Sequence, residues 1–166
     1  MGLRAGKPEL FLETQYNDRG PVFSPDGRWL AYASDESGTY QIYVRAFPGA
    51  PSGPGGKWPI SNSGGIFPVW ARNGRELFFR SEDNHVMAAS YTVKGDSFIA
   101  DKARVWSPKT IADIGQAGTN FDVAPDGKRV AALMPVEGPE QQKAQSHVIF
   151  LLNFFDELRR RVPLGK

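Results

Sequence analysis

The chain has 166 residues, of which 40% are hydrophobic and 12% aromatic, which fits one folded domain and excludes an intrinsically disordered chain. A formal net charge of +2 is too small to indicate a nucleic-acid-binding protein, and the absence of cysteine excludes disulfides and cysteine-ligated metals. The first ten residues lack the apolar core of a signal peptide, and no run reaches the roughly 20 apolar residues of a membrane span. We therefore expect no membrane insertion and, for the chain as written, no export.

One sequence motif occurs three times in the chain: PVFSPDGR at 21–28, PVWARNGR at 68–75 and FDVAPDGK at 121–128. Strand-forming residues flank each copy, and the Asp-Gly or Asn-Gly pair suits a tight turn because Gly adopts positive φ and Asp or Asn tolerates turn geometry. Units of roughly 40–50 residues rich in strand formers indicate the blades of a β-propeller. The sequence thus predicts an all-β fold.

The elements follow in chain order within a single domain over 1–166. Residues 9–14 predict an outer strand, and 21–61, 67–106 and 119–153 predict three four-stranded blades. In the second blade we expect the third strand over 86–89 and the fourth over 104–106. The third blade ends without a fourth strand of its own, so residues 9–14 are expected to complete a last blade.

A short helix is predicted over 154–162. Asn153 can cap it, and its apolar residues fall on one stripe, while three arginines follow at the C-terminal end, where positive charge is favourable (Phe154, Leu158, Val162; Arg159–Arg161).

Three segments resemble the Pro-Asp propeller repeats of TolB-like proteins: residues 24–32, 42–45 and 73–79. They are most similar to the C-terminal sensor-like propellers of bacterial membrane-bound serine/threonine kinases and related orphan proteins. The resemblance covers roughly residues 9–163. It implies a six-bladed propeller used for protein–protein contact, often outside the cytoplasm, and it transfers no catalytic residue. Such relatives have about six blades, whereas this chain has three.

Motifs for chemistry are few. The two histidines, His85 and His147, each lie in a strand-like segment, no Gly-x-Ser-x-Gly elbow occurs, and the glycine-rich loop before Lys57 lacks phosphate-loop spacing. We expect no catalytic residue, no metal and no cofactor, and a non-enzymatic binding, scaffold or sensor-like module. The alternative is a propeller lyase or hydrolase with a central-channel site, and a third possibility is a detached sensor lobe whose other parts are encoded elsewhere.

The candidate binding residues lie in the loops that enter the innermost strand of each blade. In a propeller these loops converge on one face around the central channel, and loops on a rigid scaffold commonly carry recognition. They are, in chain order, Asn17, Asp18 and Arg19, then Gly64, Gly65 and Phe67, then Thr119 and Asn120.

Three blades cannot close a ring, and an open ring would expose apolar faces and an unpaired strand edge. A C2 homodimer of two three-blade chains would make six blades. We expect residues 9–14 of each subunit to complete the third blade of the other, near Val148–Leu152. Another protein remains a second expected type of partner.

Overall fold

The computed structural model describes residues 10–47, 56–115 and 117–136. This part of the chain forms eleven strands and no α-helix, so the all-β prediction is confirmed. All of it except Val136 belongs to one compact unit. The predicted helix over 154–162 and the last strand near 148–152 lie outside the described residues. Residues 10–14 form no strand in the single chain, and their exchange between subunits stays a prediction.

The three copies of the repeated motif fold into the same turn. In each turn the Asp or Asn side chain accepts a hydrogen bond, 3.0–3.1 Å long, from the backbone N–H two residues further on (Asp26, Asn73 and Asp126). The next residue is a glycine with φ of 67–70°, a left-handed conformation that costs little only without a Cβ (Gly27, Gly74 and Gly127). The turn chemistry of the repeat therefore fixes three antiparallel hairpins.

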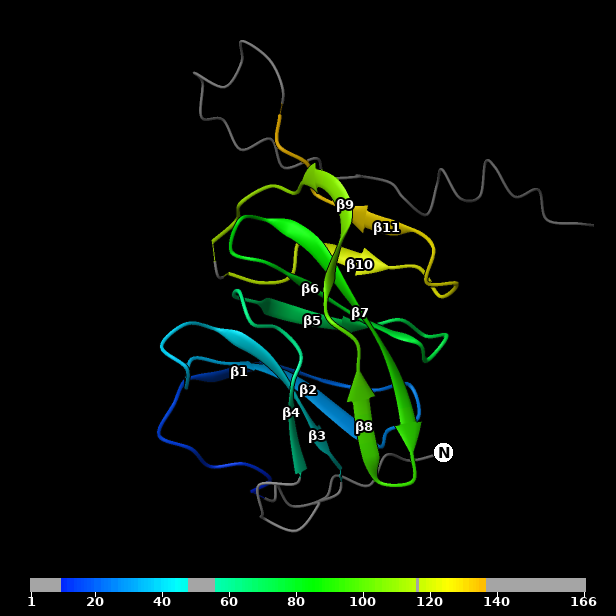
Figure 1. The fold of residues 1–166 in the computed structure, drawn as a ribbon. Coiled ribbons are helices and arrows are strands. Elements are labelled where there is room, and N and C mark those ends of the chain that lie inside the picture. Colours follow the sequence, from blue (N-terminus) through cyan, green and yellow to red (C-terminus); the bar gives the residue numbers. More distant parts are fainter. Residues whose placement is uncertain (1–9, 48–55, 116, 137–166) are drawn as a thin grey trace, which may run out of the picture. The chain divides into compact units, whose positions relative to one another are not determined.

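The first sheet is an antiparallel meander with the order β1-β2-β3-β4 (Figure 1). Its strands are β1 (Asp18–Phe23), β2 (Trp29–Ser34), β3 (Gln41–Ala46) and β4 (Lys57–Pro59). The second strand is buried over its whole length and pairs with a strand on each of its two edges. This is the strand order expected for the first repeat.

The second sheet contains one hairpin that the sequence analysis did not predict. Its strands are β5 (Ile66–Trp70), β6 (Glu76–Arg80), β7 (His85–Lys94), β8 (Ser97–Ala100) and β9 (Arg104–Thr110). The first half of β7 pairs with β9, and its second half continues to Lys94 and pairs with β8. The expected strands over 86–89 and 104–106 are therefore each longer than predicted, and Gly95, at φ 59°, makes the extra turn.

The third sheet, within the described residues, has two strands, β10 (Phe121–Val123) and β11 (Val130–Ala132). Phe121 and Val123 pack towards the second sheet, with Val130 and Ala132 beside them. The remaining strands expected for the third repeat lie outside the described residues, so the number of complete blades stays a prediction.

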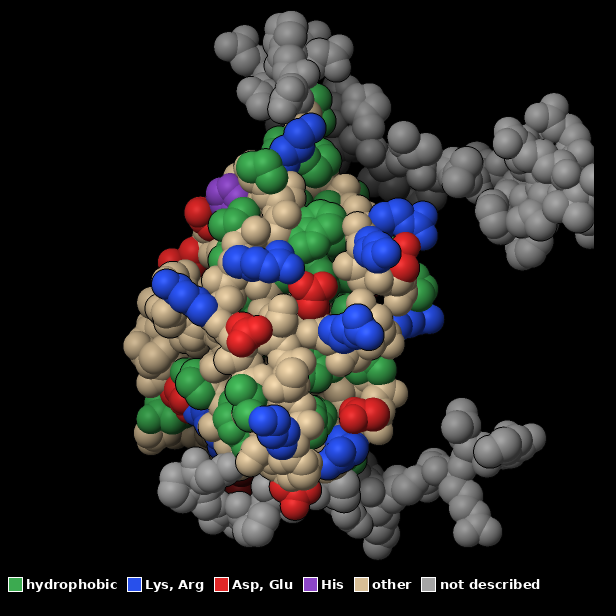
Figure 2. Space-filling view, turned by 45° about the vertical axis from the view of Figure 1, so that its right-hand side comes forward, with side chains coloured by type: hydrophobic (Ala, Val, Ile, Leu, Met, Phe, Trp, Pro, Cys, Tyr) green, Lys and Arg blue, Asp and Glu red, His purple; other side chains and the backbone are tan. Residues whose placement is uncertain are grey.

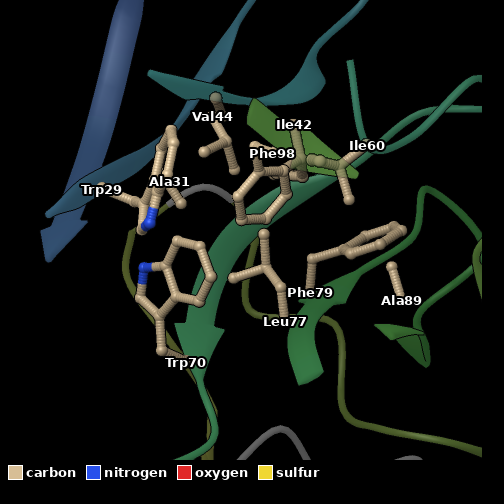
Figure 3. Packing of buried hydrophobic residues seen from close by; sticks show 11 residues of the cluster. Trp29, Ala31, Ile42, Val44, Ile60, Trp70, Leu77, Phe79, Ala89 and Phe98 are labelled. Atoms are coloured by element: carbon tan, nitrogen blue, oxygen red, sulfur yellow. The ribbon is translucent and has the colours of Figure 1, made fainter. Parts of the chain in front are cut away.

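The core consists of two apolar layers, one on each face of the second sheet. Leu77 and Phe79 pack with residues of the first sheet, including Ile42 and Val44 (Figure 3). Phe78, between them in sequence, points to the opposite face and joins the third sheet. A sheet that is covered on both faces by neighbouring sheets is what adjacent propeller blades require.

Phe98 of the unpredicted hairpin belongs to the layer between the first and second sheets. Its ring is 2% exposed and stacks on Tyr91 with a centroid distance of 4.9 Å. Figure 3 shows it among side chains of both sheets. The turn of the same hairpin accepts a 2.9 Å hydrogen bond at Gly95 O from Arg28 Nη2 of the first sheet. The hairpin thus ties the two sheets together.

Candidate functional site

A pocket of about 240 Å³ lies where the strands of the second sheet meet the loops from neighbouring repeats. It is formed by the end of β6, the turn between β6 and β7, the loop into β5 and the loop that precedes β10. The residues that line it are Tyr40, Gly65, Ile66, Arg80, Glu82, Asn84, Asp113 and Gly115. This is the side of the sheets at which the sequence analysis placed the candidate binding loops.

Arg80, the last residue of β6, is the buried charge of this pocket, with 4% of its surface exposed. Its Nη2 donates a 2.6 Å hydrogen bond to Gly115 O, and Nη1 lies 4.0 Å from Asp113 Oδ1, which is beyond hydrogen-bond length. Nε and Nη1 are buried and make no hydrogen bond. A buried guanidinium with unsatisfied N–H groups is costly, and a ligand or water at these donors would remove that cost.

The guanidinium of Arg80 lies over the ring of Phe67, with Arg80 Cζ 5.1 Å from the ring centroid. The Phe67 φ of 56° is a genuine outlier for a bulky residue, and the pairing of β5 with β6 shifts register at this point. The distortion places the ring on the same side of the sheet as the second apolar layer. Backbone strain of this kind costs about 1–3 kcal/mol and is concentrated at functional sites.

The loop into β5 is held by a buried polar network. Ser61 Oγ donates to Gln41 Oε1 at 2.7 Å and accepts the N–H of Ile42 at 2.8 Å, and Gly64 N–H donates to the same Gln41 oxygen at 3.1 Å. A Cβ on Gly64 would lie 2.5 Å from Cγ of Glu82, so glycine allows the Glu82 side chain to lie against the loop backbone. The network therefore holds the loop that forms one wall of the pocket.

The turn that carries Glu82 and Asn84 is held by Asp83. Ser81 Oγ donates to Asp83 Oδ1, and His85 Nδ1 lies 3.0 Å from Asp83 Oδ2. The hydrogen bond from Ser81, and next the one from His85, lower the pKa of the Asp83 carboxyl. His85 thus has a structural partner in the turn. The described residues include no group of three or more His, Asp or Glu side chains suited to a metal ion. His147 lies outside them.

The structure brings only some of the predicted binding residues to the pocket. Gly65 lines it, Gly64 and Phe67 adjoin it, and Arg19 reaches its border, with the guanidinium 4.1 Å above the ring of Tyr40. Asn17 and Asp18 instead make local hydrogen bonds, to Asp35 at 2.7–2.9 Å and from Thr14 at 2.7 Å. A binding role for any of them stays a prediction.

The third loop is also mainly structural where it is described. Asn120 is buried and donates a 2.5 Å hydrogen bond to Ala112 O, whereas Thr119 is exposed. The sequence analysis missed Arg80, Glu82 and Asp113. The one available signal was Arg80 itself, a charged residue directly after the apolar run Leu77–Phe79, where the other repeats have Ala33 and Leu133.

Charge over the surface is mixed. In Figure 2 acidic and basic side chains alternate over one face of the molecule, which agrees with the small net charge of the sequence. None of the described segments forms a helix with the length and apolar character needed to span a membrane.

Comparisons with known proteins found a partial structural similarity. No protein family matches the chain, and no curated protein does. Among solved structures, one assigned as a TolB of Agrobacterium tumefaciens is similar at 23% sequence identity and a TM-score of 0.40. The similarity covers 57% of this chain and 36% of the Agrobacterium protein. This chain therefore spans little more than a third of the length of that protein. It assigns neither family nor function.

Proposed function

We propose that this chain is a non-enzymatic protein-binding module of the propeller type, completed by a second copy of itself. The observation that carries the proposal is the exposure of Phe23 at the free face of the first sheet. Its side chain is 54% exposed, although it stands in a core position of the repeat.

The strand registers define that position. Phe23, Trp70 and Val123 are each the last residue before a repeated turn, paired with Leu30, Leu77 and Val130 respectively. Trp70 is 7% exposed and Val123 is 6% exposed, because each packs against the sheet that precedes it in the chain. The first sheet has no preceding sheet among the described residues, so its Phe23 lacks the equivalent contact.

Other apolar side chains surround this free face. Phe11 and Phe23 both pack on Phe47, with centroid distances of 5.0 and 4.8 Å, and Leu10 is largely exposed. Part of the face is already covered, because Leu30, Tyr32 and Tyr43 are buried within the single chain. The apolar surface left for a partner is therefore centred on Phe23 and the segment that contains Leu10 and Phe11.

The occupant proposed for this face is the third sheet of a second copy. Two chains of three repeats make the six blades that a closed propeller of this type needs, and C2 symmetry repeats the contact at both junctions. Residues 9–14 of each subunit would add a strand to the third blade of the other. Two such junctions would bury on the order of 2,000 Å², the size of a stable homodimer interface. The channel-face loops of the ring would then be the surface that contacts another protein.

Sedimentation equilibrium at micromolar concentration tests the assembly. We expect a species of twice the chain mass of 18.3 kDa, and we expect Phe23→Glu and deletion of residues 1–14 each to shift it towards monomer. Ile99→Glu is the matched control, because Ile99 is similarly exposed but lies on the outer hairpin. A stable, well-folded wild-type monomer would refute the proposal, as would equal effects of the two glutamate substitutions.

A further inference from the structure

We propose that the pocket at the end of β6 binds a small zwitterion with one carboxylate and one ammonium group, the chemistry of a free α-amino acid. This site does not depend on the assembly proposed above, since all of its lining residues come from one chain. The argument rests on the charges of the pocket, on the polar groups that lack partners and on its size.

The first feature is the unused donor capacity of Arg80. Of the five N–H groups of a guanidinium, the one on Nε and the two on Nη1 have no acceptor. The nearest carboxylate, that of Asp113, is 4.0 Å from Nη1 and is committed elsewhere, because its Oδ1 accepts the N–H of Gly115 at 2.8 Å. A ligand carboxylate at these donors would form the charge-assisted hydrogen bonds that the protein itself does not provide.

The second feature is the presence of two acidic side chains beside this cation. Glu82 makes no hydrogen bond or ion pair within the described part of the chain. Asp113 accepts the Gly115 N–H and contacts Arg80 through Oδ1 alone, so its Oδ2 has no partner among the described residues. An anion such as phosphate would meet two carboxylates, and a simple cation would meet a guanidinium. A ligand that carries both signs can satisfy the guanidinium and a carboxylate at the same time.

The third feature is the size and polarity of the pocket. A volume of about 240 Å³ accommodates an amino acid of small or medium size and is below the usual range of drug-sized sites. The hydroxyl of Tyr40 and the side-chain amide of Asn84 also lack hydrogen-bond partners among the described residues. With Ile66 as the main aliphatic side chain in the lining, a polar or short ligand side chain fits best.

The walls have the features of a preformed site. Gly64 allows the Glu82 side chain to lie against the loop, and the strained backbone of Phe67 holds an aromatic ring against the Arg80 guanidinium. Preorganised groups of this kind lower the entropic cost of binding a small ligand.

NMR titration of the full-length ¹⁵N-labelled protein tests the proposal, with the twenty common L-amino acids added one at a time. We expect at least one to bind with a Kd of about 0.01–1 mM and to shift amides of residues 64–67, 80–84 and 113–115. The analogues of that ligand that lack either the amine or the carboxylate should bind at least about tenfold more weakly, because each loses one charge-assisted contact. For alanine these analogues are propionate and ethylamine.

Three variants complete the test. Arg80→Met should abolish binding, and Glu82→Gln should weaken the amino acid several-fold while leaving the amine-free analogue unchanged. Arg72→Met removes an exposed arginine from the turn at the other end of β6 and should change nothing. Because Arg80→Met alters a buried residue, its spectrum must first show a folded protein, and the exposed Glu82→Gln provides the second, independent reading.

Three results would overturn the inference. The first is that no amino acid shifts the pocket amides at about 10 mM, which would leave water as the partner of Arg80. The second is binding that survives both Arg80→Met and Glu82→Gln. The third is equal binding of the amino acid and of its single-charge analogues, which would contradict the requirement for both charges.

Discussion

Replacing Phe98 by alanine tests whether the hairpin of β7 and β8 holds the first two sheets together. The Phe98 ring lies 4.9–6.0 Å, between centroids, from four other aromatic rings on four different strands (Trp29, Trp58, Trp70 and Tyr91). Removal of a buried Phe ring costs about 3–5 kcal/mol, and each favourable ring pair adds about 0.5–1.5 kcal/mol to simple burial. We therefore expect a loss near the upper end, about 5 kcal/mol, from a total stability of about 5–15 kcal/mol.

Urea unfolding followed by tryptophan fluorescence measures this loss, at one fixed protein concentration because assembly would contribute to stability. With a slope of about 2 kcal/mol per molar urea, the midpoint should fall by roughly 2.5 M. Phe98→Leu keeps most of the volume and should cost less than about 1.5 kcal/mol. Ile99→Ala, on the exposed side of the same strand, should stay within about 0.5 kcal/mol of the wild type.

Equal midpoints for Phe98→Ala and Ile99→Ala would refute the reasoning, because the two residues differ chiefly in burial. Hydrogen exchange provides a second criterion. If Phe98→Ala removed protection only from residues 91–100 and left the global midpoint unchanged, the hairpin would open alone, and its role as a tie between the sheets would be wrong.

Three further predictions concern turns and titratable groups. Gly27→Ala should lower the free energy of unfolding, measured by thermal unfolding, by about 1–2 kcal/mol through backbone strain alone, since no atom lies within 4 Å of the added Cβ. Gly64→Ala should cost more because the added Cβ also displaces Glu82. Equal losses for the two variants would contradict this reasoning. Burial, and next the charge of Asp26, raises the pKa of Tyr91 to about 12. The contribution of the neutral Tyr91 hydroxyl to stability is therefore complete below pH 10 and is lost as the pH rises through 12. Ultraviolet titration should show this late ionisation, and Tyr91→Phe should remove it. The hydrogen bond from Ser81, and next that from His85, lower the pKa of Asp83 below 3.8. The stability that the ionised Asp83 contributes is therefore present above pH 3.8 and is lost as the pH falls through the pKa of the folded state. NMR titration of the carboxyl group should show the lowered pKa, and an unshifted pKa would contradict this prediction.

The hairpins could be predicted from the sequence because their cause is local. A glycine at positive φ, preceded by an Asp or Asn that accepts a nearby N–H, determines the turn without help from the rest of the fold. The three copies therefore adopt one geometry, although the second has Arg72 and Asn73 where the first has Pro25 and Asp26.

The rest depends on contacts between distant segments. The alternation of Tyr91 and Val93, followed by Gly95 and Asp96, is a readable hairpin signal, but nothing local shows that Phe98 packs on the first sheet. One residue of the candidate loops, Gly65, lines the pocket. Arg80 follows an apolar run in β6, and only packing shows that it is buried with unused donors.

The contact of Phe98 with Trp29 also sets an order of events during synthesis. The first sheet is complete in sequence at Pro59, but the hairpin that covers its apolar face emerges about 40 residues later, which takes roughly 2–8 s at usual elongation rates. During that interval Ile42 and Val44 gain only the part of their partner layer that β5 and β6 supply, and the nascent chain still exposes apolar strand surface around Trp29. The two sheets thus form one cooperative unit, and the vulnerable period for aggregation ends only when β8 leaves the ribosome.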